Sequence, residues 1–202
     1  MKSLHALPDL EEFAGCIHSH DDLSKIIRGH QCIEAALEHL ISEALPYRHD
    51  ALIKRLQFTL KVDLAIGLVA IDRDAREGLL ALNKIRNRFA HELANSFSRE
   101  EVDAVMNGLS KRQRFIVKDG VNYEEPAERF RVACCAIFFD LITTLKKAQD
   151  QKLWDQATHE FAEEMIADDH KYYENVDDEI KARFLKLKEQ PGAPGSRPSF
   201  GR

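Results

Sequence analysis

The stretch REGLLALNKIRNRFAHEL, residues 76–93, combines a helical pattern of apolar residues with several chemically active side chains. At 100° per residue, Leu79, Leu82 and Phe89 fall on one arc of a helix, which predicts a single apolar face. Arg86 lies on the same arc, so we expect its guanidinium to be partly removed from water. An arginine in that position needs an opposite charge and hydrogen-bond acceptors.

Two other helical patterns each place an acid among apolar residues. Glu34 falls on the apolar arc of a helix expected at residues 21–45. Asp63 falls on the apolar arc of a helix expected at residues 50–69. We therefore expect Glu34 or Asp63 to pair with Arg86 across a contact between helices.

Helical periodicity recurs along the rest of the chain, and no convincing strand alternation is present. Asp21 can cap the first long helix, Pro46 ends it, and Ser98 with Glu101 forms a capping box for a later helix. An Asp-Gly turn allows a small hairpin across residues 117–121. The sequence therefore predicts an all-α helical bundle, with helices at residues 21–45, 50–69 with a break near Thr59, 72–93, 98–109 and 126–151.

The charge balance changes near residue 150. Residues 150–189 carry 12 acids and 6 bases, whereas residues 1–149 carry 22 acids and 21 bases. Residues 190–202 hold three of the six prolines and three of the nine glycines, which is typical of a disordered tail. The expected organisation is an N-terminal lead-in at 1–20, a helical bundle at 21–151, an acidic helical extension at 152–189 and a disordered tail at 190–202.

The bulk composition restricts the function. A formal net charge of −5 and a pI near 6.0 argue against a passive nucleic-acid coat protein, so any contact with nucleic acid must be local. The four cysteines form no C-x-x-C pair, which favours reduced, buried thiols. The first twelve residues lack the apolar core of a signal peptide, and the longest apolar stretch, residues 132–139, is too short to span a bilayer. We expect a cytoplasmic protein.

The hexad from Arg86 to His91 holds the strongest candidates for chemistry. A guanidinium binds phosphate through two hydrogen bonds, and histidine transfers protons near neutral pH. His91 lies about 140° around the helix from Arg86 but only about 40° from Asn87. Lys84 and Arg88 flank that face and make a small basic patch suited to RNA. Arginine and histidine together are a minimal set for cleaving RNA without a metal.

A purely structural interpretation explains the same residues. A pair between Arg86 and an acid can fix the register of two packed helices. An exposed His91 near the end of a helix can simply complement the helix dipole. The geometry of the pattern leaves both interpretations open.

The hexad also resembles a known signature. Arg86-Asn87-x-x-x-His91 is similar to the R-x4–6-H motif of the HEPN superfamily, an all-helical group that includes many metal-independent endoribonucleases. Three motifs follow one another in the chain: Ile27-Arg28-Gly29 followed by Glu34, then Leu64-x-x-Gly67-Leu68-Val69, then Ile85 to His91. Their order resembles the mannitol-repressor-like branch of that superfamily, and the likeness covers residues 21–92. We expect the helix at 126–151 to be the last member of the bundle.

The resemblance implies roles for these residues. Arg86 would bind and polarise the scissile phosphate, and His91 would transfer a proton. Asn87 would orient the phosphate or the histidine, and Glu34 would hold Arg86. The 2′-hydroxyl of RNA would be the nucleophile and would leave a cyclic phosphate, with no metal and no cofactor. The site would lie in a cleft between two protomers of a homodimer.

Two functions follow from the resemblance. The first is a ribonuclease in toxin–antitoxin biology, stress response or phage defence, with an antitoxin or regulatory protein as its partner. The second is a non-enzymatic transcriptional regulator or protein-interaction adaptor, because mannitol-repressor-like proteins are regarded as regulators.

Other sites have weaker support. His18, His20 and Asp21 lie close together in the lead-in, but no further ligand pattern accompanies them, so no metal site is expected. His30 lies on the apolar stripe of its helix and is expected to be a core histidine with a satisfied hydrogen bond. His91 is not followed by the second histidine of a zinc H-E-x-x-H helix.

Overall fold

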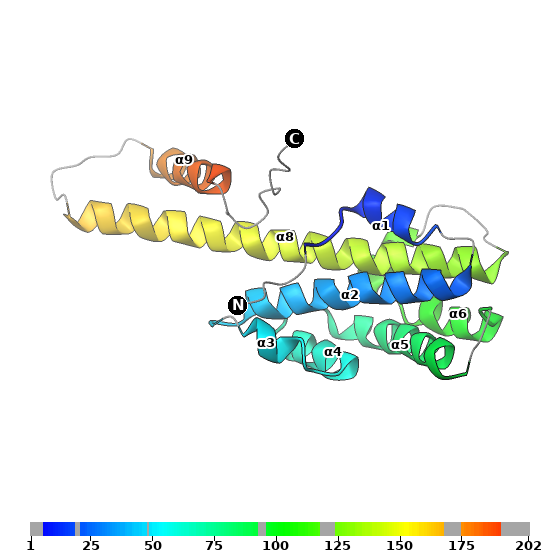
Figure 1. Ribbon diagram of the computed structural model, residues 1–202. Coiled ribbons are helices and arrows are strands. Elements are labelled where there is room, and N and C mark those ends of the chain that lie inside the picture. Colours follow the sequence, from blue (N-terminus) through cyan, green and yellow to red (C-terminus); the bar gives the residue numbers. More distant parts are fainter. Residues whose placement is uncertain are drawn as a thin grey trace, which may run out of the picture. The chain divides into compact units, whose positions relative to one another are not determined.

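The computed structural model describes residues 6–18, 21–47, 49–92, 96–117, 124–167 and 175–190. Every regular element within these ranges is helical, which confirms the all-α prediction (Figure 1). The contacts divide the chain into two units, residues 1–145 and 146–202. Within the described residues, no helix has the length and apolar character needed to cross a membrane.

Helix α2 (Asp22–Ala44) organises the first unit. Asp21 caps it by accepting a hydrogen bond from the backbone N–H of Ser24, as its position before the apolar pattern predicts. The helix ends before Pro46, and its buried face includes Ile33, Leu37 and Ile41. In Figure 1, α2 lies beside α8 on one side and beside α3, α4 and α5 on the other. It therefore carries both the core and one wall of the candidate site.

The expected lead-in contains a helix that the sequence pattern did not reveal. Helix α1 (Leu10–Cys16) is capped by Asp9, and its Phe13 stacks on Phe138 with ring centroids 4.1 Å apart. Phe13 and Ile17 are fully buried. A seven-residue helix is too short to show a repeating apolar stripe, so helical periodicity gave no signal for α1 within the lead-in.

The predicted helix at 50–69 is two helices, α3 (Asp50–Ile53) and α4 (Phe58–Gly67), and the break falls just before the expected position. Beyond α4, Val69 has a φ of 57° and the backbone N–H of Ala70 donates to the carbonyl of Ala65. This is the hydrogen-bond pattern of a helix end that normally uses glycine. A β-branched residue in this left-handed conformation is strained.

Helix α5 (Arg76–His91) follows a single turn of 3-10 helix, η1 (Arg73–Ala75), and confirms the helix predicted from the opening stretch. Its apolar arc is buried, including Leu79, Leu82 and Phe89. His91 is the last helical residue, so α5 ends at the motif histidine.

Helix α6 (Arg99–Asn107) begins with the predicted capping box, in which Ser98 and Glu101 bond each other's backbone N–H groups. Its end touches the start of α5, where the N–H of Gly78 donates to the carbonyl of Gly108 at 2.9 Å. A Cβ on Gly78 would lie 2.7 Å from that carbonyl oxygen, so the two backbones approach this closely only because glycine is present. The contact fixes α5 against α6.

Helix α7 (Lys111–Val117) occupies the residue where a hairpin strand was expected to begin. Val117 is helical, so the hairpin is wrong at that position, and residues 118–123 lie outside the described residues. The helix is anchored by the side chain of Gln113, whose amide donates to buried Asp140 at 3.1 Å. Arg112 also reaches Asp140.

Helix α8 (Pro126–Ala167) starts at the predicted proline but continues well past the expected end near Gln151. In the second unit it carries Ala157 and Phe161, which form a small apolar cluster with Ile180 of helix α9 (Val176–Glu189).

Ion pairs from Glu164 to Arg183 and from Asp150 to Lys188 show that the two helices of the second unit run antiparallel. The acidic extension is therefore a pair of helices with its own small core. Apart from Gln190, the tail expected at 190–202 lies outside the described residues.

Candidate functional site

Helix α5 presents Arg86 to a polar hollow of about 410 Å³ in the first unit. Residues of α2, of the α3–α4 connection and of the first turn of α4 complete its walls. We call this hollow the Arg86 pocket. Its lining residues are His30, Glu34, Leu56, Gln57, Phe58, Thr59, Asn83, Arg86 and Asn87.

Arg86 is half-buried and lacks the expected acidic partner. Its Nη1 donates to the side-chain oxygen of Asn87 at 3.1 Å. Within the described ranges, no carboxylate lies within salt-bridge distance of its guanidinium. The predicted pairing of Arg86 with Glu34 or Asp63 is therefore wrong.

Both candidate acids are bound by other cations. Glu34 accepts from Nζ of Lys61 at 2.5 Å, and Asp63 accepts from Nε of Arg76 at 2.8 Å. Helical periodicity gave the direction in which each acid points, but it could not say which cation of a neighbouring helix would lie nearest. In the folded chain, Lys61 takes the place that we expected Arg86 to fill.

Lys61, which binds a carboxylate of the pocket wall, is a residue that the sequence pattern did not single out. Its side chain is only 2% exposed, and it also donates to Glu38 at 2.6 Å. Burial opposes its charge, but the hydrogen bonds to Glu34 and Glu38 outweigh that effect, so the pKa of Lys61 lies above its ordinary value. The available signal was a single cation between the apolar residues Leu60 and Val62.

His30 is buried, as predicted for a core histidine, and it also lines the Arg86 pocket. Its Nε2 lies 3.1 Å from the side-chain oxygen of Asn83, and its ring packs against Phe58 with centroids 4.4 Å apart. An amide oxygen can only accept, so Nε2 carries the hydrogen and Nδ1 keeps a lone pair. Nδ1 lies 3.8 Å from Glu34 Oε2, beyond hydrogen-bond distance.

Several groups act on the proton of His30. Burial lowers the pKa of His30 most, and the positive charges of Arg86 and Lys61 act in the same direction. Glu34 and the hydrogen bond with Asn83 oppose them without reversing the result. At neutral pH the pocket therefore holds an uncharged imidazole beside a guanidinium.

His91 lies apart from this pocket. It is exposed at the end of α5, and it is not among the residues that line the Arg86 pocket. Within the described ranges, no hydrogen bond or ion pair engages its ring. The structure thus brings Arg86, Asn87 and Glu34 together with His30, and it leaves His91 and Asp63 outside.

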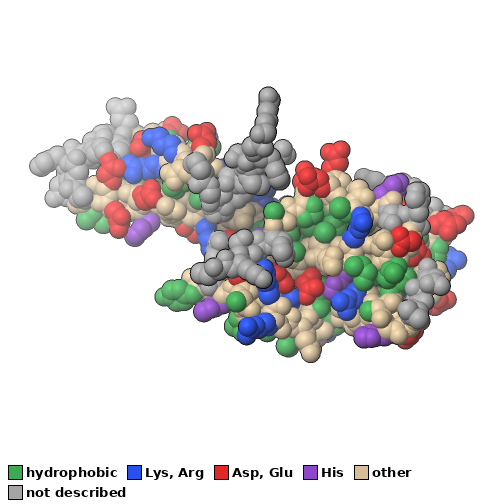
Figure 2. Space-filling view, viewed as in Figure 1, with side chains coloured by type: hydrophobic (Ala, Val, Ile, Leu, Met, Phe, Trp, Pro, Cys, Tyr) green, Lys and Arg blue, Asp and Glu red, His purple; other side chains and the backbone are tan. Residues whose placement is uncertain are grey.

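The expected basic patch is smaller than its residues suggest. Lys84 is exposed, but Arg88 is bound by both carboxylate oxygens of Glu101 and by the carbonyl of Ser96. Burial opposes the charge of Glu101, yet its bond with Arg88 lowers its pKa overall. On the face drawn in Figure 2, Lys and Arg side chains are interspersed with Asp and Glu side chains.

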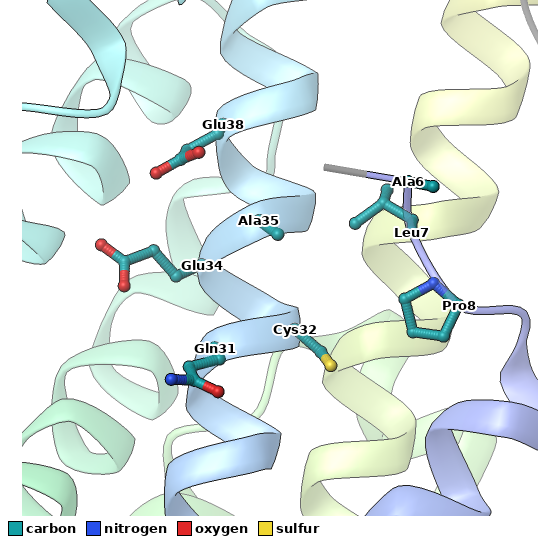
Figure 3. Close-up of a pocket in the computed structure, with 8 residues that line it drawn as sticks. All are labelled: Ala6, Leu7, Pro8, Gln31, Cys32, Glu34, Ala35 and Glu38. Atoms are coloured by element: carbon teal, nitrogen blue, oxygen red, sulfur yellow. The ribbon is translucent and has the colours of Figure 1, made fainter. Parts of the chain in front are cut away.

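A second hollow, of about 420 Å³, lies between α2 and residues 6–8. Figure 3 shows Glu34 and Glu38 extending from one side of α2, away from Leu7 and Pro8 beside the other side. No lysine, arginine or histidine is among the described residues that line it. This hollow therefore lacks a cation for an anionic ligand, and we place the candidate site in the Arg86 pocket.

Within the described residues, no group of three or more His, Cys, Asp or Glu side chains is placed to hold a metal ion. Of the metal candidates considered from the sequence, His20 lies outside the described residues, and His18 is exposed just beyond α1. Comparisons with protein-family models, with curated proteins and with solved structures find no match to this chain.

The chemistry of the Arg86 pocket follows from its own groups. A guanidinium has five N–H donors, and Arg86 uses Nη1 toward Asn87. Its remaining donors can bind two oxygens of a planar or tetrahedral anion. The amides of Asn83 and Asn87 and the imidazole of His30 supply further polar contacts around it.

Proposed function

We propose that this chain is a metal-independent endoribonuclease of the HEPN type, in which Arg86 binds the scissile phosphate of RNA. The observation that supports this best is the guanidinium of Arg86, half-buried in a polar pocket and, among the residues that the structure describes, without a carboxylate at salt-bridge distance. A guanidinium that is partly removed from water and not paired with a carboxylate attracts an anionic ligand. The nearby bond to Asn87 holds the guanidinium in position for that ligand.

The proposed reaction needs no metal. The 2′-oxygen of RNA attacks the phosphorus, the bond from phosphorus to the 5′-oxygen breaks, and a 2′,3′-cyclic phosphate forms. His91 gives a proton to the departing 5′-oxygen, while the 2′-hydroxyl loses its proton to solvent. Arg86 stabilises the charge that builds up on the phosphate oxygens.

The exposed position of His91 fits a site completed by a second copy of the chain. Its ring has no partner within the described ranges, so it is accessible to a substrate that extends beyond the Arg86 pocket. We therefore propose a homodimer whose cleft brings His91 to the phosphate held by Arg86.

The second candidate function is a non-enzymatic regulator or adaptor. The observation that favours it is the separation of the two motif residues, because His91 does not line the Arg86 pocket. In that case the pocket would bind an acidic group of a partner protein, and no bond would be broken.

The deciding experiment measures cleavage of single-stranded RNA in EDTA. We expect the wild type to cut RNA to 2′,3′-cyclic phosphate ends and to leave DNA intact, because DNA lacks the 2′-hydroxyl. Arg86→Ala and His91→Ala should each remove nearly all cutting. Matched controls are Arg28→Ala and His49→Ala, which remove an exposed arginine and an exposed histidine elsewhere in the first unit.

Equal cutting by the wild type and His91→Ala would overturn the ribonuclease proposal, since the activity would not depend on the motif. Absence of cutting by the wild type, together with a protein that co-purifies through the Arg86 pocket, would favour the regulator.

A further inference from the structure

The charges in and next to the Arg86 pocket balance one another. Arg86 and Glu34 line the pocket, and Lys61, which is not among the lining residues, binds both Glu34 and Glu38. Two positive charges are thus matched by two negative charges. His30 is neutral because burial and the two cations lower its pKa. An anion that enters the pocket therefore leaves an uncompensated negative charge unless another group becomes positive.

We propose that the Arg86 pocket binds a phosphodiester anion together with one proton, which His30 takes up at Nδ1. This inference rests on the proposed ribonuclease function and assigns a role there to a histidine outside the motif. His30 lines the pocket, and its hydrogen bond with Asn83 leaves Nδ1 as the nitrogen that can accept the proton. The resulting imidazolium and Arg86 hold the phosphate between two cations.

The groups around His30 favour this uptake once an anion is present. Lys61 on α4 and Arg86 on α5 repel a proton on the imidazole, and Glu34 on its own helix attracts one. A bound phosphodiester carries one negative charge, which offsets the field of Arg86 at the imidazole. Because His30 is buried, this change acts on its proton more strongly than it would on an exposed histidine.

Glu34 also stabilises the charged form directly. Its Oε2 lies 3.8 Å from Nδ1 of His30, so a modest movement would let the protonated nitrogen donate to it. Lys61 holds the other carboxylate oxygen of Glu34 at 2.5 Å and keeps the acid beside the histidine. The contact between α2 and α4 thus positions the acceptor that the imidazolium needs.

The inference has a measurable consequence for affinity. Because binding and protonation are linked, a phosphodiester should bind more tightly as the pH falls, by at most about tenfold per pH unit for one proton. Replacing His30 with glutamine keeps a polar side chain but removes the titrating group. The pH dependence of binding should then disappear.

The test uses the full chain and the dinucleotide dTpdT, which has one phosphodiester and no 2′-hydroxyl and so cannot be cleaved by this chemistry. Histidine ring NMR follows the pH midpoint of His30 with and without dTpdT, and the signal is assigned by its loss in His30→Gln. We expect dTpdT to raise the midpoint of His30 and to leave that of exposed His49 unchanged. Calorimetry in two buffers of different ionisation enthalpy should show proton uptake in the wild type and none in His30→Gln.

Binding of dTpdT without a shift of His30, or no binding at all, would overturn the inference. RNA cleavage measured in parallel separates the two proposals. Cutting without a shift of His30 leaves the ribonuclease standing and removes the role of His30. A shift of His30 without any cutting supports the phosphodiester pocket and removes the ribonuclease.

Discussion

Arg86 and Arg88 lie two residues apart on α5, yet their surroundings differ completely. Arg88 is held by both carboxylate oxygens of Glu101 and by the carbonyl of Ser96, so its guanidinium joins α5 to the start of α6. Arg86 faces a polar pocket, and the amide oxygen of Asn87 is the only acceptor that it bonds within the described part of the chain. One arginine is used by the fold, whereas the other keeps donors for a ligand.

The difference arises from what the neighbouring helices supply. The capping box of α6 projects Glu101 toward Arg88, and the same carboxylate also accepts from the backbone N–H of Ser98. On the other side of α5, Glu34 is paired with Lys61 and not with Arg86. A buried lysine therefore keeps Arg86 available.

The largest effect on the difference between Arg86 and Arg88 is expected from replacing Lys61. In Lys61→Met, Glu34 and Glu38 lose their shared cation, and we expect the free energy of unfolding to fall by about 3 kcal/mol. The lower end of the range for buried pairs applies because both carboxylates keep some access to water. Urea unfolding measures the change.

The freed Glu34 should then pair with Arg86 and weaken the binding of dTpdT. Lys84→Met is the matched control, because Lys84 is exposed on α5 and its loss should change stability by less than about 0.5 kcal/mol. If Lys61→Met were as stable as Lys84→Met, the role given to Lys61 would be wrong.

A smaller loss of stability is expected when Arg88 loses the carboxylate that binds it. Glu101→Gln keeps the capping-box geometry, since glutamine can replace glutamate at that position, but it removes the charge that binds Arg88. We expect a loss of about 1–2 kcal/mol in urea unfolding. Glu100→Gln, an exposed neighbour, serves as the control. A loss of RNA cleavage in folded Glu101→Gln would show that the pair of Arg88 with Glu101 also serves the reaction.

The smallest effect concerns pH. The pKa of His30 is lower in the folded chain than its ordinary value of 6.5, so the unfolded chain binds this proton more readily. The contribution of neutral His30 to the free energy of unfolding is fully present above pH 6.5. It is lost as the pH falls from 6.5 toward the pKa of His30 in the folded chain. We expect the decline to be shallower in His30→Gln than in the wild type or in His49→Gln. Equal slopes in urea unfolding across this range would contradict the assignment.

Much of the fold followed from local signals. The cap at Asp21, the capping box at Ser98 and the apolar arc of α5 are all where the sequence places them. Each depends on residues of one helix and its cap. Helix α1 escaped the same reasoning because it is too short for periodicity. The length of α8 was missed because the change in charge near residue 150 indicated a boundary between two segments.

The candidate site was predicted less completely than the fold. The arcs brought Arg86 and Glu34 to one contact between helices, and the structure places both in the same pocket. Helical periodicity did not identify Lys61 as the partner of Glu34. It predicts which face of a helix a residue lies on, but pairing also depends on how far neighbouring helices are shifted along their axes. For the same reason His30 looked like a core residue alone, although it is both buried and part of the pocket wall.

The most direct test compares RNA cleavage by folded Arg86→Ala with cleavage by folded Arg88→Ala at equal concentrations. We expect Arg86→Ala to lose on the order of 10²–10³-fold in rate, as when one donor to a developing negative charge is removed. Arg88→Ala should cut RNA like the wild type and instead unfold more easily, by about 1–2 kcal/mol. Equal loss of cleavage in both variants, or loss in Arg88→Ala alone, would contradict the assignment of Arg86 to the ligand and Arg88 to the fold.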